Sequence, residues 1–129
     1  MILETSFILD YLKGEKDAVA KMQALMDADE LVGVTTPTIF ELWTGLAAVE
    51  DSNKEKSKIN SVIEDQVIYM LDKKCAEEAG RINGELIKKG LQIEPEDCMI
   101  AGIAIANNKK LLTRDGHFGR IEGLRIEKY

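Results

Sequence analysis

The sequence predicts an α/β fold built around a mostly parallel sheet. Short apolar runs that read as strands alternate with longer segments in which apolar residues recur every three or four positions, as they do in amphipathic helices. Strands that alternate with helices in this way are typical of strand–helix–strand units and of parallel sheets. The 129 residues are expected to form one domain, spanning residues 1–129, that is large enough to bury a core of its own.

The chain is expected to begin with a strand and two helices. Residues 1–3 form an apolar run that reads as the first strand, and Ser6 is expected to cap a helix that ends at Gly14. A second helix is expected over about residues 16–28, because its apolar residues share one face. Residues 31–34 read as the second strand.

Thr36 and Pro37 open the next helix, because Pro is favoured in the first turn. The charge-rich residues after Asp51 run into another helix that ends near residue 65, and residues 67–71 read as the third strand. The buried stripe of the helix after Pro37 is expected to contain Ile39, Phe40, Trp43, Leu46 and Ala47.

Asp72 is expected to cap a long helix that ends before Gly90, with lysines at its negative end. After a connector, the remaining elements are a helix over residues 96–106, a strand over 110–113, a turn at Asp115 and Gly116, and a closing strand over 124–126.

Composition narrows the functions that the chain could have. The formal net charge of −6 argues against tight, non-specific polyanion binding, so a nucleic-acid substrate would be held locally, through metal ions and a basic rim. No apolar run is long enough to span a bilayer, and residues 1–3 already read as a strand, so neither membrane insertion nor a signal peptide is expected. Cys75 and Cys98 form no metal motif and are expected to be reduced thiols of a cytoplasmic protein.

Four acidic residues are expected to meet at the carboxyl edge of the sheet, where open α/β sheets bind ligands. Two of them directly follow strands, and the helix that carries a third begins where the second strand ends. The helix that carries the fourth leads by a short turn into a strand, so it begins at the same edge. Convergence also requires the first and fourth strands to be neighbours. These acids are Glu4, Glu41, Asp97 and Asp115.

Clustered carboxylates with no Lys or Arg between them repel one another, so they favour a cation. All-oxygen ligands suit Mg²⁺ or Mn²⁺. Such an ion orients a phosphate and lowers the pKa of a bound water, which permits phosphodiester hydrolysis without a nucleophilic side chain. Thr5 and Thr113 are candidates to support the site by hydrogen-bonding the carboxylates.

Each acid also has a simpler structural explanation. Glu41 lies three residues after Thr38, as in a capping box. Asp97 lies in a first helical turn, where the helix dipole favours acids, Asp115 begins a common turn pair, and Glu4 could be solvated at the end of a strand. If all four acids lie at the same edge of the sheet, a common functional site is favoured over these separate explanations, because four unrelated caps and turns need not lie together.

Four segments of the chain carry motifs that resemble those of PIN-domain ribonucleases, specifically the VapC-type toxins of toxin–antitoxin pairs. The resemblance extends over essentially the whole chain and depends on the order and spacing of the motifs. The segments are MILETSFILD at residues 1–10, TIFELWTG at 38–45, EDCMIAG at 96–102 and LTRDGHF at 112–118.

This resemblance implies a three-layer α/β/α sandwich around a five-stranded, mostly parallel sheet. It also implies Mg²⁺-dependent cleavage of single-stranded RNA, homodimers, and neutralisation by a small VapB-type antitoxin. Carried over by motif, the acidic site is Glu4, Glu41, Asp97 and Asp115, supported by Thr5 and Thr113.

One departure from the family pattern leaves an alternative open. The family ordinarily has Asp where this chain has Glu4, whose carboxylate reaches one methylene further. A shifted metal would weaken activity, so the alternative is a degenerate binding module with little or no nuclease activity. A separate alternative is a phosphoacceptor or phosphatase domain, because those α/β folds also gather acids at strand ends. It would need a nucleophilic Asp at a strand end, where this chain has Glu4.

Overall fold

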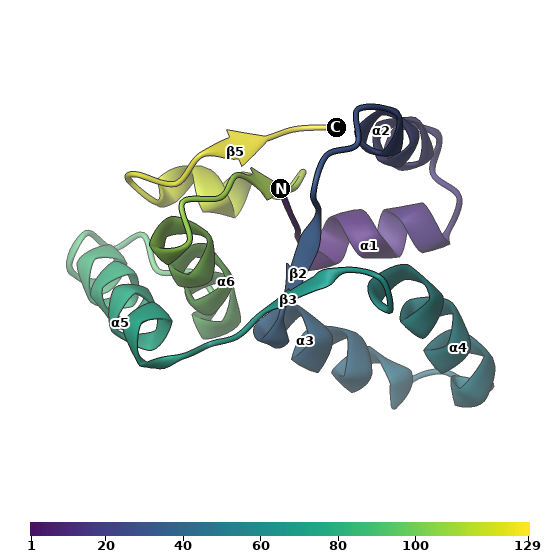
Figure 1. Cartoon of the computed structure of the whole chain (residues 1–129). Coiled ribbons are helices and arrows are strands. Elements are labelled where there is room, and N and C mark those ends of the chain that lie inside the picture. The colour runs from purple at the N-terminus through teal and green to yellow at the C-terminus, as the bar shows by residue number, and fades with distance from the viewer.

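Five strands form one parallel sheet in the computed structural model, which describes all residues from 1 to 129. The strand order is β3-β2-β1-β4-β5, and all four pairings are parallel. The predicted α/β class and the five-stranded sheet are therefore confirmed (Figure 1). The strands are β1 (Ile2–Leu3), β2 (Gly33–Thr35), β3 (Val67–Tyr69), β4 (Leu111–Leu112) and β5 (Ile126–Glu127).

Helices cover both faces of the sheet and complete the three layers. In Figure 1, α5 and α6 lie on one side of the sheet, and α1, α2 and α4 lie on the other. No helix combines the length and the apolar character that crossing a bilayer requires. The helices are α1 (Thr5–Leu12), α2 (Lys16–Asp27), α3 (Thr36–Leu46), α4 (Ser52–Ile63), α5 (Lys73–Lys88), α6 (Pro95–Ala106) and the short 3-10 helix η1 (Gly116–Arg120).

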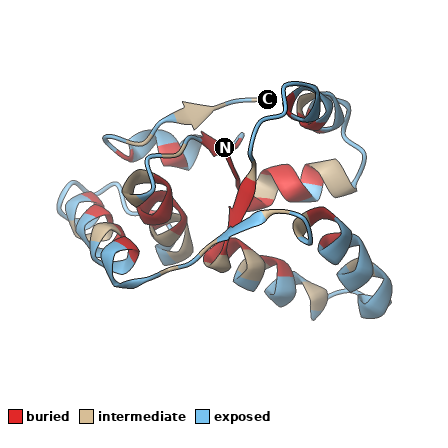
Figure 2. Cartoon of the chain, viewed as in Figure 1, coloured by how far each residue is buried: buried red, intermediate tan, exposed pale blue.

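Each central strand contributes side chains to both cores, because successive residues of a strand point to opposite faces. Ile2 and Leu111 pack with the side chains of α5 and α6, whereas Leu3 and Leu112 pack with those of α1, α2 and α4. All four side chains are fully buried. Figure 2 shows buried residues on the central strands of the sheet and on the inward faces of the helices around it.

The central strand β1 brings the acid-bearing elements together. Ile2 is in register with Gly33 of β2 on one side and with Leu111 of β4 on the other. The first and fourth strands are therefore neighbours, which the sequence alone did not establish. Because the strands are parallel, the residues that follow β1, β2 and β4 emerge at the same edge of the sheet.

The helix α3 begins three residues earlier than the proposed capping box requires. The hydroxyl of Thr35 accepts a hydrogen bond from the Thr38 backbone N–H at 3.1 Å, so Thr35 is the N-cap. Thr38 lies inside the helix and is fully buried. The capping-box explanation of Glu41 is therefore wrong.

The expected cap at Ser6 is also wrong. Helix α1 begins at Thr5, so Glu4 occupies the N-cap position and Ser6 lies in the first turn. The cap predicted at Asp72 is confirmed, because its side chain accepts a hydrogen bond from the Cys75 N–H at 2.9 Å.

The buried face of α3 differs from the predicted stripe. Phe40 and Trp43 are 60% and 36% exposed, whereas Thr38 and Leu42 are buried. Thr38 is held against the sheet by its bond to Thr35, which turns the stripe through Thr38 and Leu42 inward. The prediction failed because it counted only apolar residues and missed a buried threonine.

Candidate functional site

Four acids lie at the carboxyl edge of the sheet on four different elements. One follows β1, one lies in the second turn of α3, one lies in the first turn of α6, and one follows β4 and caps η1. In that order they are Glu4, Glu41, Asp97 and Asp115, the residues that the sequence singled out.

The Glu4 carboxylate is buried and held by two hydroxyl groups. The residue is 4% exposed, so it is not a solvated strand end. Its Oε2 accepts a hydrogen bond from Thr113 Oγ1 at 2.8 Å and another from the Ser6 hydroxyl. The first turn of α1 and the end of β4 therefore fix the orientation of this carboxylate together.

The Glu41 carboxylate is half-buried and is oriented by α1. Its Oε1 accepts a hydrogen bond from Thr5 Oγ1 at 2.9 Å. Burial raises the pKa of Glu41, the hydrogen bond from Thr5 partly offsets this rise, and the negative charges of Glu4 and Glu96 add to it. Glu41 is therefore electrostatically coupled to Glu4.

The Asp97 carboxylate is half-buried and lies among other acids. Burial raises the pKa of Asp97 from an ordinary value near 3.8 to about 7. The charges of Glu41, Glu4, Asp115 and Glu94 raise this pKa in the same direction. Burial and these negative charges therefore both oppose the ionisation of Asp97.

Asp115 keeps a local structural role. Its Oδ1 accepts a hydrogen bond from the His117 N–H at 2.9 Å, and His117 Nδ1 lies 3.1 Å from the same oxygen. The Asp115 N–H in turn donates to Thr113 Oγ1 at 3.0 Å. Asp115 is therefore the N-cap of η1 rather than part of the simple turn that was expected, and the same bonds fix its position beside Thr113.

The chemistry of these donors fits a hard divalent cation. All four side chains offer only oxygen, and no Lys or Arg forms an ion pair with any of them. However, no group of three or more His, Cys, Asp or Glu side chains is arranged so that it could hold a metal ion as it stands. Glu4 and Glu41 are instead turned toward their hydroxyl donors. The donor types therefore fit a metal, and the side chains would have to close around it.

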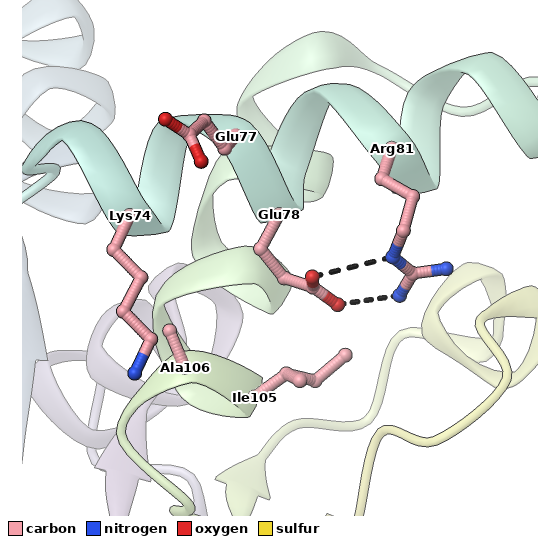
Figure 3. A pocket seen from close by; sticks show the side chains of 6 residues that line it. All are labelled: Lys74, Glu77, Glu78, Arg81, Ile105 and Ala106. Carbon is pink, nitrogen blue, oxygen red and sulfur yellow. Dashed lines mark hydrogen bonds and ion pairs between the residues drawn. The ribbon is translucent and has the colours of Figure 1, made fainter.

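A cavity at the other end of α6 shows the opposite arrangement of charge (Figure 3). It is lined by side chains of α5 and by the end of α6 at Ile105 and Ala106. Glu78 pairs with Arg81 through two bonds, and Glu77 pairs with Lys73. Because its carboxylates are neutralised by basic partners, this cavity lacks the unbalanced negative charge found around Asp97.

Two features of this edge were not anticipated from the sequence. Ser6 holds Glu4 rather than capping α1. Asp10, on the same helix, is buried and forms an ion pair with Arg114 at 3.0 Å. An acid inside an otherwise apolar helical segment was the available signal, because Asp is seldom buried without a partner.

Comparison with known proteins assigns the fold to a family. A model described as the PIN domain matches residues 1–124. The chain belongs to the PIN-domain family. Ribonuclease VapC2 from Rickettsia felis is 26% identical to it over 129 residues, covering 99% of this chain and 96% of that protein.

Solved structures share the same PIN-domain architecture. VapBC2 from Rickettsia felis, bound to a DNA fragment from its promoter, superposes with a TM-score of 0.90 at 25% identity, covering 99% of this chain and 97% of that one. DNA-bound VapBC from Salmonella typhimurium gives a TM-score of 0.87 at 25% identity, covering 98% and 96%. The likeness therefore extends over nearly the whole of each chain.

Proposed function

We propose that this PIN domain is a cytoplasmic endoribonuclease that uses Mg²⁺ or Mn²⁺ to hydrolyse phosphodiester bonds of single-stranded RNA. We further propose that it is the toxin of a VapBC-type toxin–antitoxin pair. The observation that carries the proposal is the gathering of four acids from four elements at one edge of the sheet, none of them paired with Lys or Arg. The raised pKa of Asp97, caused by burial and by the charges of the other acids, agrees with this arrangement. The likeness to Ribonuclease VapC2 supports the same chemistry.

The four acids would hold the ion, and the surrounding hydroxyls would orient them. When bound, the ion supplies charge to the substrate phosphate and lowers the pKa of water. Thr113 and Ser6 hold Glu4, and Thr5 holds Glu41, so these hydroxyls would limit how far the two carboxylates turn when the side chains close around an ion. The role of the threonines is to position these acids, because neither hydroxyl needs to touch RNA.

The substitution Asp97→Asn tests the proposal. The amide is nearly isosteric with the acid, so the fold is retained, but it removes the charge that would bind metal. Replacing groups that only orient a ligand already costs about 10–100-fold, so we expect cleavage of a single-stranded RNA with Mn²⁺ to fall by at least roughly a hundredfold. The control is Asp65→Asn, an exposed acid just before β3 at the opposite edge of the sheet, which should cleave normally. Equal cleavage by wild type and Asp97→Asn would reject the proposal.

The Glu4 position separates an active nuclease from a degenerate binding module. The Glu4 carboxylate accepts hydrogen bonds from the hydroxyls of Thr113 and Ser6, so the longer side chain of Glu fits this position. Shortening it by one methylene in Glu4→Asp would draw the carboxylate away from Thr113 and Ser6. Since misplacement of about 1 Å can cost roughly a hundredfold, we expect Glu4→Asp to lower the rate of RNA cleavage. An inactive wild type together with an active Glu4→Asp variant would instead favour the degenerate module.

We propose two protein partners for this chain. One is a small VapB-type antitoxin, supported by the likeness to VapBC structures from two bacteria. The other is a second copy of the chain, supported by large apolar side chains that remain exposed, among them Phe40, Trp43 and Met70. If a small protein encoded beside this chain is its antitoxin, adding it in purified form should suppress RNA cleavage.

A further inference from the structure

Two basic residues follow neighbouring strands on the flank of the acidic site. Arg114 lies two residues after β4, and Lys128 directly follows β5. The two strands are paired and parallel, and Lys128 Nζ lies 3.4 Å from the Arg114 carbonyl oxygen, to which it donates a hydrogen bond. Both cations therefore emerge at the carboxyl edge, beside Asp115. We call Arg114 and Lys128 the basic flank.

The guanidinium of Arg114 is held in place by the buried carboxylate of Asp10 on α1. One of its nitrogens lies 3.0 Å from Asp10 Oδ1, and the Asp10 side chain is only 3% exposed. The other carboxylate oxygen of Asp10 accepts a hydrogen bond from Tyr129 Oη at 2.7 Å, and the Tyr129 ring packs edge-on against Phe7 with centroids 4.8 Å apart. Asp10 is thus satisfied at both oxygens and anchors Arg114 to α1.

The anchored guanidinium still faces solvent. The Arg114 side chain is 61% exposed, and its only charged partner is Asp10. A guanidinium carries five N–H donors in a fixed plane, so one contact with Asp10 leaves most of them available. That planar set of donors matches the oxygens of a phosphate, and a guanidinium that is already oriented loses less entropy when it binds.

We propose that the basic flank binds backbone phosphates of the RNA strand next to the bond that is cleaved. This inference rests on the proposed nuclease function and names the contacts that hold its substrate. A chain with a net charge of −6 needs local cations to retain a polyanion, and the basic flank adjoins the acidic edge directly at Arg114 and Asp115. Phosphate contacts fix the position of a strand without reading its sequence, so the flank sets affinity and register rather than base preference.

The test measures RNA binding separately from cleavage. An Asp97→Asn background prevents cleavage, and fluorescence anisotropy with a labelled single-stranded RNA oligonucleotide and Mg²⁺ then gives the dissociation constant across a range of salt concentrations. Lys128→Gln removes one cation that has no buried partner. Asp10→Asn with Arg114→Gln removes the other without leaving a buried charge unpaired, because breaking a buried ion pair on one side only can unfold a protein. Thermal melts check that each variant is folded.

Each of these changes should weaken binding roughly tenfold at low salt, in keeping with the loss of a hydrogen bond to a charged group. Each should also lower the slope of log affinity against log salt by about 0.7, the contribution of one contact to single-stranded nucleic acid. The matched control is Arg125→Gln. Arg125 hydrogen-bonds Asn108 in the connection that precedes β4, on the opposite edge of the sheet, so its loss should change neither quantity.

Unchanged affinity and an unchanged salt slope in both variants would overturn the basic flank and leave Arg114 as a partner of Asp10 alone. Failure of the nuclease proposal has a different result. In that case the unsubstituted chain does not cleave RNA with Mn²⁺, whatever the binding experiment gives. RNA cleavage by the unsubstituted chain, together with a salt slope lowered by about 0.7 in each flank variant, supports both proposals.

Discussion

At the scale of single residues, Asp97 is the proposed metal ligand whose ionisation is most clearly opposed by its surroundings. Its pKa of about 7 means that the carboxyl loses its proton near neutral pH, where the other acids oppose its charge. A divalent ion would reverse this balance, since it favours the ionised form of every acid around it. The same shift makes Asp97 a source of pH-dependent instability when no ion is bound.

We expect Asp97→Asn to stabilise the metal-free protein above neutral pH. In the unfolded chain Asp97 loses its proton near pH 3.8, but in the folded chain it does so near pH 7, so the folding stability that it contributes below pH 4 is lost as the pH rises to 7. Asn has no such loss. After allowance for solvent screening at this half-buried site, the variant should gain about 1–2 kcal/mol at pH 8 and nothing at pH 4.

Thermal unfolding in EDTA across pH 4–8 measures this difference. The melting temperature of Asp97→Asn should exceed that of wild type by roughly 3–8 °C at pH 8, given the enthalpy of a domain of this size. Asp65→Asn serves as the control, because it replaces an exposed acid outside the edge and should follow wild type throughout. A difference between Asp97→Asn and wild type that is constant over the whole range would contradict the raised pKa.

The hydroxyl of Thr5 gives a second prediction at this scale. Its hydrogen bond opposes the rise in the pKa of Glu41, so Thr5→Val should raise that pKa further and leave the carboxylate without a fixed orientation. We expect Mn²⁺ affinity, measured by calorimetry, to fall by about 10–100-fold, as it does when groups that orient metal ligands are removed. Thr44→Val is the matched control, since Thr44 only bonds a carbonyl within α3. Equal Mn²⁺ affinity in Thr5→Val and wild type would count against a role for Glu41 in metal binding.

The sequence located all four acids, because each is tied to the end of a strand or to the start of a helix. It did not predict the partners of those acids. Thr5 and Ser6 lie in one helical turn, but only the fold determines that Thr5 reaches Glu41 and Ser6 reaches Glu4. The ion pair of Asp10 and Arg114 was equally inaccessible, since its members are 104 positions apart (114 minus 10) and no local pattern joins them.

At the scale of elements, α6 is held in place by close packing against α5. Gly102 of α6 lies so near α5 that an added Cβ would be 2.7 Å from the Ala79 nitrogen and 2.9 Å from the Ala79 Cα. This contact fixes the position of the helix whose first turn carries Asp97. The position of the acid therefore depends on a glycine five residues along the same helix.

We expect Gly102→Ala to destabilise the protein even though Ala is the better helix former. Overpacking of this kind typically costs about 1–3 kcal/mol, which exceeds the gain of up to about 1 kcal/mol from replacing Gly in a helix. Gly84→Ala in α5 is the matched control, because no atom lies within 4 Å of the added Cβ, and it should be neutral or stabilising. Urea unfolding of both variants measures the difference, and equal stability would show that α5 and α6 can separate without cost.

The ends of helices were predicted well where a local sequence signal was strong. The buried face of a helix was predicted less well, because it depends on packing against the rest of the fold. The turn at Gly14 and the cap at Asp72 follow from backbone and side-chain chemistry that a sequence displays. The buried face of α3 does not, because Thr38 is polar yet fully buried. Phe40 and Trp43 consequently face outward, against the usual preference of aromatic side chains for a core.

At the scale of the whole molecule, the strand order brings four separate acids to one edge of the sheet. Had β1 and β4 been separated by another strand, Glu4 could not have met the hydroxyl of Thr113. Local sequence carries no information on this order, since two-residue strands such as Ile2–Leu3 could pair with several partners. The resemblance to PIN domains implied a five-stranded, mostly parallel sheet but no strand order, so the pairing of β1 with β4 is known from the fold alone.

The outward aromatics of α3 lead to a prediction about assembly. Phe40 and Trp43 lie three residues apart on one exposed face of the helix, and aromatic side chains are enriched where proteins associate. If this face joins two copies of the chain, Trp43→Ala should raise the dimer dissociation constant by roughly thirtyfold or more, the effect of losing a central interface residue. Met26→Ala removes a more exposed apolar side chain from α2 and serves as the control. Sedimentation equilibrium over a range of concentrations gives both constants. If the dimer tolerates Trp43→Ala but not Met26→Ala, the two copies associate through another surface. If the unsubstituted chain stays monomeric at high concentration, the predicted dimer is excluded.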